Sequence, residues 1–163
     1  EVDPTFSPDG EQVAFGWRGE KSDNWDVYTK MVGSPEVRRL TTDPALEGAP
    51  SWSPDGRQIA YSCGRAGSAA VDLFTICLVS PLGGAVRRLG DFPIRAVVPP
   101  TWSPDGRWLA VQRASSPAEP GLDGLYLVPV QGGEPRRLAL PQAAKGLSHQ
   151  SFSPVSTDEM SWA

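Results

Sequence analysis

Short apolar runs alternate with clusters of Gly, Pro, Asp and Ser along this 163-residue chain, and the pattern repeats. Each of the three complete units begins with an aromatic residue before Ser-Pro, continues with two apolar runs and ends with Arg-Arg-Leu, and a fourth unit begins in the same way. The aromatic residues are Phe6, Trp52, Trp102 and Phe152. Short runs rich in β-branched and aromatic residues, bounded by turn formers, predict β-strands rather than helices.

Two of the four connections in each complete unit have a constant length. The step from the first aromatic residue to the end of the next apolar run is 9 residues in all three units. The step from the second apolar run to the leucine of Arg-Arg-Leu is 12 residues, whereas the other connections range from 12 to 16. Because alternate connections of an antiparallel sheet lie at opposite ends, we expect constant turns on one face and variable loops on the other.

Four strands per unit of about 50 residues are typical of a β-propeller blade. We therefore predict an all-β fold, a partial β-propeller that occupies residues 1–163 as a single domain. Three four-stranded antiparallel blades are expected at about 3–43, 49–92 and 99–141, followed by the trailing hairpin of a fourth at 149–163. The fourth unit lacks Pro-Asp-Gly, so its hairpin is expected to be less regular.

The repeated Ser-Pro-Asp-Gly segment is either a turn or a repeated carboxylate site. Proline presets the backbone at the second position of a turn, Asp suits the third, and Gly supplies a positive φ. A calcium loop would need further Asp, Asn or Glu ligands, which these segments lack. We therefore interpret Asp9, Asp55 and Asp105 as parts of turns and predict no metal site.

The units resemble the WD40-like repeats of TolB-type β-propellers. The resemblance rests on aromatic-Ser-Pro-Asp-Gly, the apolar triplet after it, the third strand and the terminal Arg-Arg-Leu-Thr, and it covers residues 1–153. It implies a propeller of about six or seven blades in a longer protein. Such propellers serve as periplasmic interaction domains, as appendages of bacterial kinases and winged-helix regulators, and as gating domains of prolyl-oligopeptidase-like hydrolases. The first unit is most similar to the kinase- and regulator-linked kind, and the family favours a periplasmic or extracytoplasmic location.

Composition and motifs exclude several classes of function. The net charge of −4 argues against the basic surface of a nucleic-acid binder, so no nucleic-acid partner is predicted. No apolar run approaches the roughly 18 residues of a membrane span. The chain contains neither a Gly-x-Ser-x-Gly elbow nor a phosphate-binding glycine loop, and its single histidine, His149, falls in a loop. We therefore predict no catalytic residues, no enzyme activity in this segment and no cofactor.

The two cysteines and the three arginine pairs are interpreted as structural. Cys63 and Cys77 fall near opposite ends of one expected hairpin, so we predict two free thiols. The arginine pairs open the outermost strand of each blade, at 38–39, 87–88 and 136–137. They protect strand edges or form a belt for an acidic partner, and the net negative charge favours edge protection.

Binding residues are expected on the face with variable loops, because loops on a rigid scaffold carry most binding functions. Aromatic and arginine side chains are enriched at interaction hot spots. The candidates are Trp17, Arg18, Trp25, Arg65, Arg95 and Arg113.

These observations predict a non-catalytic interaction or sensor module that binds a protein partner or a neighbouring domain of the same chain. The alternatives are the gating propeller of a prolyl-oligopeptidase-like serine peptidase and a propeller that binds a small ligand or carbohydrate. Three blades and a hairpin cannot close a ring. Either the neighbouring blades belong to a longer protein, which is the explanation that we favour, or two copies complete each other by self-association through the open blade edges.

Overall fold

The computed structural model describes residues 1–20, 24–64, 74–90, 94, 98–113 and 121–138. Its regular elements within these ranges are β-strands, which form three four-stranded antiparallel sheets. The prediction of an all-β partial propeller is confirmed, and the hairpin expected at 149–163 lies outside the described residues. Among the described residues there is no helix long and apolar enough to cross a membrane.

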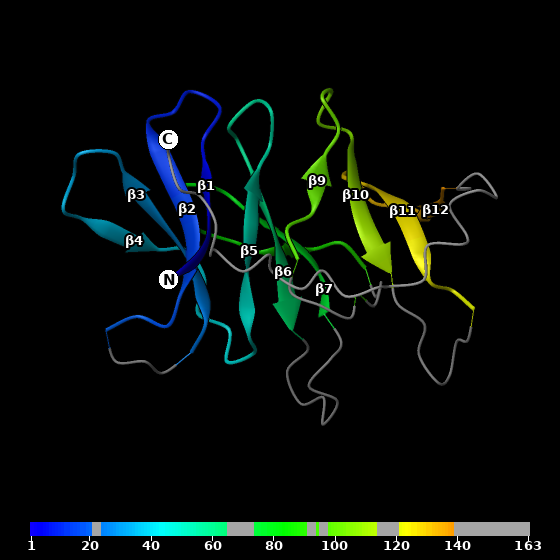
Figure 1. Cartoon of the computed structure of the whole chain (residues 1–163), viewed down its shortest axis with the longest axis horizontal. Helices are drawn as coiled ribbons and strands as arrows, with labels where there is room; N and C mark the ends of the chain where they lie inside the picture. The colour runs from blue at the N-terminus through cyan, green and yellow to red at the C-terminus, as the bar shows by residue number, and fades with distance from the viewer. Residues whose placement is uncertain (21–23, 65–73, 91–93, 95–97, 114–120, 139–163) are drawn as a thin grey trace, which may run out of the picture.

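Within each sheet the order of the strands in space follows their order in the chain. The first sheet contains β1 (Val2–Phe6), β2 (Gln12–Trp17), β3 (Asp26–Met31) and β4 (Val37–Arg39). The second contains β5 (Glu47–Trp52), β6 (Ile59–Gly64), β7 (Phe74–Val79) and β8 (Arg87–Arg88). The third contains β9 (Thr101–Trp102), β10 (Trp108–Arg113), β11 (Gly124–Pro129) and β12 (Arg136–Arg137). We name these sheets blades 1, 2 and 3, and they stand side by side in Figure 1.

The first strands of blades 1 and 2 carry a bulge that blade 3 lacks. Asp3 and Ala49 have φ values of 50° and 52°, and the pairing of each strand with its neighbour shifts register at these points. Pro99 occupies the corresponding place in blade 3. Since proline holds φ at about −65°, the same bulge cannot form there. The first strand of blade 3 is accordingly reduced to two residues, Thr101–Trp102.

Apolar side chains between neighbouring blades form two cores. We call the side of a blade that meets the preceding blade its leading face and the opposite side its trailing face. The trailing face of blade 1 (Ala14, Val27 and Leu40) packs against the leading face of blade 2 (Trp52, Ile59, Tyr61, Cys63, Cys77 and Val79). The trailing face of blade 2 (Ala60, Phe74, Ile76, Leu78 and Leu89) packs against the leading face of blade 3 (Trp102, Leu109, Val111, Tyr126, Val128 and Val130). This burial of both faces of blade 2 is the main force that holds the three blades together.

The aromatic residue before Ser-Pro links each later blade to the one before it. The indole nitrogen of Trp52 donates a hydrogen bond to the carbonyl of Thr5 at 3.2 Å. The indole nitrogen of Trp102 donates to the carbonyl of Ser51 at 3.0 Å. Phe6 has the same position in blade 1 but no such donor, and its side chain is 64% exposed.

Candidate functional site

The Ser-Pro-Asp-Gly segments form the turns between the first and second strands, which lie along one edge of the molecule (the top of Figure 1). In blade 1 the hydroxyl of Ser7 donates to Asp9 Oδ1 at 2.6 Å, and the backbone N–H of Glu11 donates to the same oxygen at 3.0 Å. The backbone N–H of Gln12 donates to Ser7 Oγ at 2.9 Å. Gly10 has a φ of 74°, which glycine adopts without a steric penalty. Every residue type of the motif except proline, which presets φ, therefore has an observed role in closing the turn.

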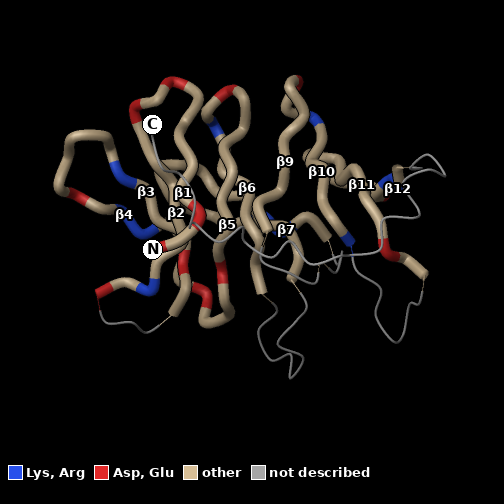
Figure 2. The backbone as a smooth tube through the Cα atoms, viewed as in Figure 1, with Lys and Arg blue, Asp and Glu red and all other residues tan. Residues whose placement is uncertain are grey.

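The same geometry recurs in the other two blades. Ser53 donates to Asp55 Oδ1 and Ser103 to Asp105 Oδ1, each at 2.6 Å. Hydrogen bonds from the serine and from the backbone N–H two residues later lower the pKa of all three turn carboxyls, and that of Asp105 falls to about 2. Figure 2 shows acidic residues at the tips of the three turns. The interpretation of these aspartates as parts of turns is confirmed, and no group of three His, Cys, Asp or Glu side chains able to hold a metal ion occurs in the described ranges.

On the opposite face, hydrogen bonds fix the described parts of the loops between blades 1 and 2. Asn24 Nδ2 donates to the carbonyl of Asp43 at 2.5 Å and to the carbonyl of Ala45 at 3.1 Å. The backbone N–H of Ala45 donates to Asp43 Oδ1 at 2.8 Å. The backbone N–H of Glu47 donates to the carbonyl of Trp25 at 2.9 Å. The loop that enters β3 is therefore joined directly to the loop that enters β5.

The first arginine of each pair in blades 1 and 2 binds the next blade. Arg38 Nη1 donates to the carbonyl of Leu82 at 3.3 Å, and Arg87 Nη1 donates to the carbonyl of Val130 at 2.7 Å. Both carbonyls belong to the turn between the third and fourth strands of the following blade. These arginines therefore connect blades, a role that neither edge protection nor an acidic-partner belt describes.

The second arginine of each pair binds its own blade. Arg39 forms an ion pair with the carboxylate of Asp26, at the start of β3. Arg88 Nη2 donates to the carbonyl of Gly64 at 3.0 Å, at the end of β6. Arg137 Nη2 likewise donates to a carbonyl just before β11, at 2.6 Å. In each blade this arginine holds one end of the connection between the second and third strands.

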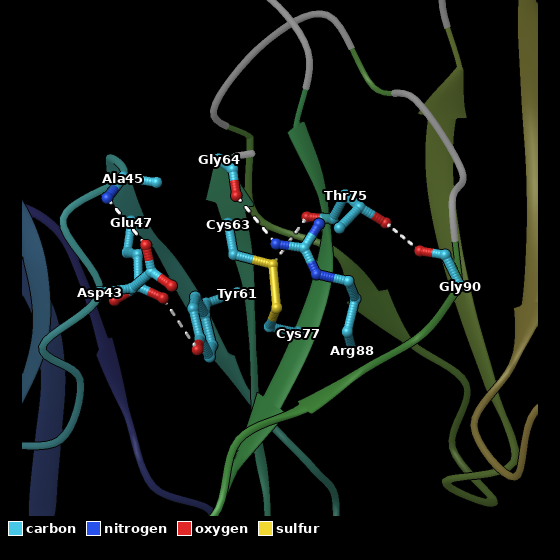
Figure 3. The surroundings of a disulfide bond; sticks show 10 residues. All are labelled: Asp43, Ala45, Glu47, Tyr61, Cys63, Gly64, Thr75, Cys77, Arg88 and Gly90. Atoms are coloured by element: carbon cyan, nitrogen blue, oxygen red, sulfur yellow. Dashed lines mark hydrogen bonds between the residues drawn. A yellow bond between two sulfur atoms is a disulfide. The ribbon is translucent and has the colours of Figure 1, made fainter. Parts of the chain in front are cut away.

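A buried polar cluster lies between blades 1 and 2, below these loops. The side chains of Glu47 and Asp26 are 3% and 0% exposed, and the hydroxyl of Tyr61 donates to Glu47 Oε1 at 3.1 Å (Figure 3). Burial raises the pKa of Glu47 to about 7, although hydrogen bonds from Thr41 and Tyr61 oppose the rise. Burial and the neighbouring Glu47 also raise the pKa of the Tyr61 hydroxyl. Glu47 is therefore a carboxyl group that changes charge near neutral pH within an interface between blades.

Cys63 and Cys77 form a disulfide, so the prediction of two free thiols is wrong (Figure 3). In the observed register Cys77 pairs with Tyr61, and Cys63 pairs with Thr75. The two cysteines are thus diagonal neighbours on one side of the sheet, with Cα atoms 5.9 Å apart, a separation that a disulfide spans. The prediction failed because it placed the cysteines near opposite ends of the hairpin. Both side chains are buried in the interface with blade 1.

The same diagonal position holds a different contact in each blade. In blade 1 the rings of Trp17 and Tyr28 meet edge to face, with centroids 5.1 Å apart. In blade 3 the guanidinium of Arg113 lies over the ring of Tyr126, 5.8 Å from its centroid. An aromatic pair, a disulfide and a cation–π contact therefore join the second and third strands at equivalent points.

The binding candidates from the sequence fall at several places. Trp17 and Arg113 end the second strands of blades 1 and 3, and they belong to these diagonal contacts. Arg18 is exposed directly after β2, and Trp25 is half-buried directly before β3. Arg65 and Arg95 lie outside the described residues. Sequence reasoning missed Glu47. The feature that could have identified it is a single charged residue at the start of a strand that is otherwise uncharged.

Comparison with known proteins identifies the repeat. Residues 1–115 match the model of a protein family described as PD40, the TolB beta propeller domain. This chain belongs to the TolB β-propeller family. A search of curated proteins finds no match.

Solved structures with the same fold include two TolB proteins and an enzyme. The putative TolB from Agrobacterium tumefaciens is 25% identical with a TM-score of 0.67, and the match covers 86% of this chain and 47% of that one. TolB from Acinetobacter baumannii is 22% identical with a TM-score of 0.63, over 82% of this chain and 33% of that one. An oligogalacturonate lyase in complex with manganese is 20% identical with a TM-score of 0.61, over 83% and 35%. The TolB-family chain therefore spans half or less of the length of each of these structures.

Proposed function

We propose that this TolB-family propeller segment is a non-catalytic interaction module, which binds a protein partner or a neighbouring domain through its variable-loop face. The observation that carries the proposal is a difference between the two faces: one consists of repeated structural turns, and the other carries loops of individual length and sequence. On the constant face, the aspartate of every Ser-Pro-Asp-Gly turn already accepts hydrogen bonds within its own turn. On the other face, exposed side chains such as Leu46 belong to loops whose ends are hydrogen-bonded to a rigid sheet. Loops held in this way are suited to binding.

We further propose that the module acts in an oxidising compartment outside the cytoplasm. The support is the buried disulfide between Cys63 and Cys77. Disulfides form and persist in the periplasm and other extracytoplasmic compartments and are rare in the cytosol. Membership of the TolB family agrees with this location.

The other roles considered for this fold are the gating propeller of a serine peptidase, a ligand- or carbohydrate-binding propeller, and an appendage of a kinase or regulator. Puromycin hydrolase has a similar fold, at 23% identity and a TM-score of 0.59. At this identity the likeness concerns the fold alone. No contact among the described residues favours any of these roles over a protein-binding module.

Site-specific photo-crosslinking in cells that express the chain tests the proposal. A photoreactive residue in place of Arg18 or Leu46, on the variable face, is expected to capture one protein, which mass spectrometry identifies. The same residue in place of Glu11 or Arg57, on the constant turns, serves as the matched control and is expected to capture none.

The captured protein is then purified and titrated against two variants. Arg18→Ala is expected to weaken its binding about tenfold, which corresponds to roughly 1.4 kcal/mol. Asp55→Ala is expected to leave binding unchanged, because this aspartate serves the turn. Equal capture from both faces would contradict the proposal. Saturable binding of an oligosaccharide, with no protein captured, would favour the carbohydrate-binding alternative.

A further inference from the structure

The segment 41–46 joins blade 1 to blade 2 on the variable face and contains no regular secondary structure. It lies directly against the end of β6. The backbone N–H of Gly64 donates to the carbonyl of Leu46 at 2.8 Å. A Cβ atom at Gly64 would come within 3.0 Å of that carbonyl oxygen and 3.2 Å of the Cβ of Ala45. The segment is thus closely packed but is not paired as a strand, and such segments open locally at a lower free energy than strands do.

Glu47 directly follows this segment, and its carboxyl group is closed off from solvent. The oxygen Oε1 accepts the hydrogen bond from Tyr61, whereas Oε2 has no hydrogen-bond partner among the described residues. Figure 3 shows the carboxyl group beside Asp43 of the segment and directed toward the Tyr61 hydroxyl. A buried carboxylate is costly unless it is both paired and hydrogen-bonded. The closed segment therefore favours the protonated form of Glu47.

The charged groups that blade 1 and the segment place around this glutamate do not compensate a negative charge on it. β3 contributes Asp26, whose ion-pair partner is Arg39 of β4. β2 contains no charged side chain, and Asp3 of β1 and Arg18 after β2 are exposed. Burial, followed by the negative charges of Asp26 and Asp43, raises the pKa of the buried glutamate. Ionisation therefore places a third negative charge beside two others.

Blade 2 is held firmly on its own side of the glutamate. The disulfide between Cys63 and Cys77 joins β6 to β7 beside Tyr61 (Figure 3). Arg88 of β8 donates to the carbonyl of Gly64, and its charge partly offsets the rise in the pKa of Tyr61 that burial causes. Because β6 and β7 are cross-linked, we expect the rearrangement that admits water to the glutamate to occur in the 41–46 segment and not in the sheet.

We propose that the 41–46 segment responds to pH: it stays closed over Glu47 while this carboxyl group is protonated and separates from the end of β6 more readily once the proton is lost. Opening breaks the hydrogen bond between Gly64 and Leu46 and lets water reach the carboxylate. Because the segment belongs to the variable face, pH then alters the shape of that face. The opening is measured without a partner, so its test is separate from that of the binding role proposed above.

The pH range follows from the two pKa values of Glu47. Its pKa is about 7 under the closed segment and returns to the usual 4.5 when water reaches the group. Below pH 4.5 both forms are protonated, and the opening equilibrium does not depend on pH. Between pH 4.5 and 7 only the open form loses its proton, so opening becomes about tenfold more favourable per pH unit. Above pH 7 both forms are ionised, and the total gain is about 300-fold.

Amide hydrogen exchange followed by NMR tests the opening in the wild type and in Glu47→Gln. The reporters are the amides of Glu47 and Gly64, which donate to the carbonyls of Trp25 and Leu46. After correction for the intrinsic exchange rate, we expect equal protection in the two proteins at about pH 4. At about pH 8 we expect about 300-fold less protection in the wild type, because glutamine cannot ionise. Glu36→Gln, at an exposed position, is the control and is expected to behave like the wild type. Equal protection in wild type and Glu47→Gln at both pH values overturns the proposal.

Dilute urea separates local opening of the segment from unfolding of the whole protein. The amides of Leu89 and Val130, which donate within blades 2 and 3, serve as the reference. Urea accelerates exchange in proportion to the surface that an opening exposes. We expect it to accelerate exchange at the two reference amides and to leave exchange at Glu47 and Gly64 nearly unchanged. The same urea dependence at all four amides overturns the proposal, because the segment would then open only with the whole fold.

A substitution that forces the segment open provides the reciprocal test. Gly64→Ala places a Cβ atom 3.0 Å from the carbonyl oxygen of Leu46 and is expected to push the segment away at every pH. Because opening and proton loss are linked, the pKa of Glu47, measured from the ¹³C shift of its carboxyl group, is expected to fall from about 7 toward 4.5. Gly16→Ala, whose Cβ would meet the Val2 side chain at 3.2 Å, is the matched control and is expected to leave this pKa near 7. A Gly64→Ala protein that is folded by circular dichroism and keeps the wild-type pKa overturns the proposal.

Discussion

Blades 1 and 2 are built on the same repeat, but their leading faces use different residues. Blade 2 has Trp52 and Val79 in places where blade 1 has Phe6 and Lys30. The blade 2 residues are buried against a neighbour, whereas Lys30 is half-buried and Phe6 is exposed. The repeat therefore fixes the backbone, and the surface across the interface determines which side chains each position tolerates. A lysine costs little where its amine still reaches water, and it would be expensive in the closed interface.

The diagonal position between the second and third strands shows the same effect. In blade 2 it lies in a closed interface and holds the compact Cys63–Cys77 disulfide. In blade 1 it holds the larger pair Trp17 and Tyr28, beside a hollow. Bulky aromatic rings fit on the face that no blade among the described residues covers, and a small covalent link fits on the face that one does cover. The following predictions test this difference between the two blades.

The largest effect is expected from removal of the disulfide. Replacement of both Cys63 and Cys77 by alanine is expected to lower the free energy of unfolding by about 3 kcal/mol, because the cross-link restricts the unfolded chain. Trp17→Ala, at the corresponding place in blade 1, is expected to cost less, since its side chain is only half-buried. Urea denaturation of the oxidised protein and of both variants measures the two losses. Equal losses would mean that the two diagonal contacts contribute alike despite their different burial.

The buried carboxyl of Glu47 gives the next largest effect, and its sign depends on pH. The pKa of Glu47 rises from 4.5 to about 7 on folding because the group is buried. Its contribution to stability is therefore complete below about pH 4.5 and is lost as the pH rises through 7. Glu47→Gln keeps an acceptor for Tyr61 and cannot ionise. We expect it to match the wild type at pH 4 and to be more stable by about 2 kcal/mol at pH 8.

Thermal or urea unfolding of Glu47→Gln across this pH range measures that difference. The exposed Glu36→Gln removes the same charge from the surface of blade 1 and serves as the control. A difference between Glu47→Gln and the wild type that stays constant with pH would show that Glu47 keeps its charge in the folded interface.

A third prediction concerns the indole that joins the two blades. Trp52→Phe removes the hydrogen bond to the carbonyl of Thr5 and gives blade 2 the residue that blade 1 has at this place. We expect a loss of about 1 kcal/mol in the free energy of unfolding. Trp25→Phe is the matched control, because its indole nitrogen makes no hydrogen bond among the described residues. If both substitutions cost the same, the loss reflects ring size rather than the bond between blades.

The sequence predicts the strands and turns of the three blades well, for a physical reason. The 9- and 12-residue steps and the residue types of Ser-Pro-Asp-Gly are local, and local turn chemistry fixes the register of a hairpin. The contacts that cross blades are not local. Arg38 and Leu82 lie 44 residues apart in the chain, and no spacing rule within one unit pairs them.

The disulfide was missed for a related reason. The loop between the second and third strands differs in length from blade to blade. The sequence of blade 2 therefore does not show where β6 ends and where β7 begins. The observed register brings Cys63 next to Thr75 and thus diagonal to Cys77. The burial of Glu47 could not be predicted from the sequence either, because it depends on where blade 1 packs rather than on the residues of β5 itself. The sequence thus predicts the hairpins whose turns have a constant length, and it fails where the loop length varies between blades or where a neighbouring blade decides what is buried.

The smallest effect is expected at the turns, where blades 1 and 3 differ by one side chain. Arg107 in blade 3 donates to Asp105 Oδ2 at 2.7 Å, whereas blade 1 has Glu11 at the same place. The pKa of Asp105 is lowered from 3.8 to about 2, first by Ser103 and then by Arg107. A lowered pKa stabilises the fold above about pH 3.8 and ceases to do so as the pH falls through 2.

Asp105→Asn is therefore expected to lower the melting temperature by about 2 °C at pH 6 and to have no effect at pH 2. Asp9→Asn, without an arginine beside it, is expected to lower it by less. A larger loss for Asp9→Asn than for Asp105→Asn would show that the arginine adds nothing to the turn.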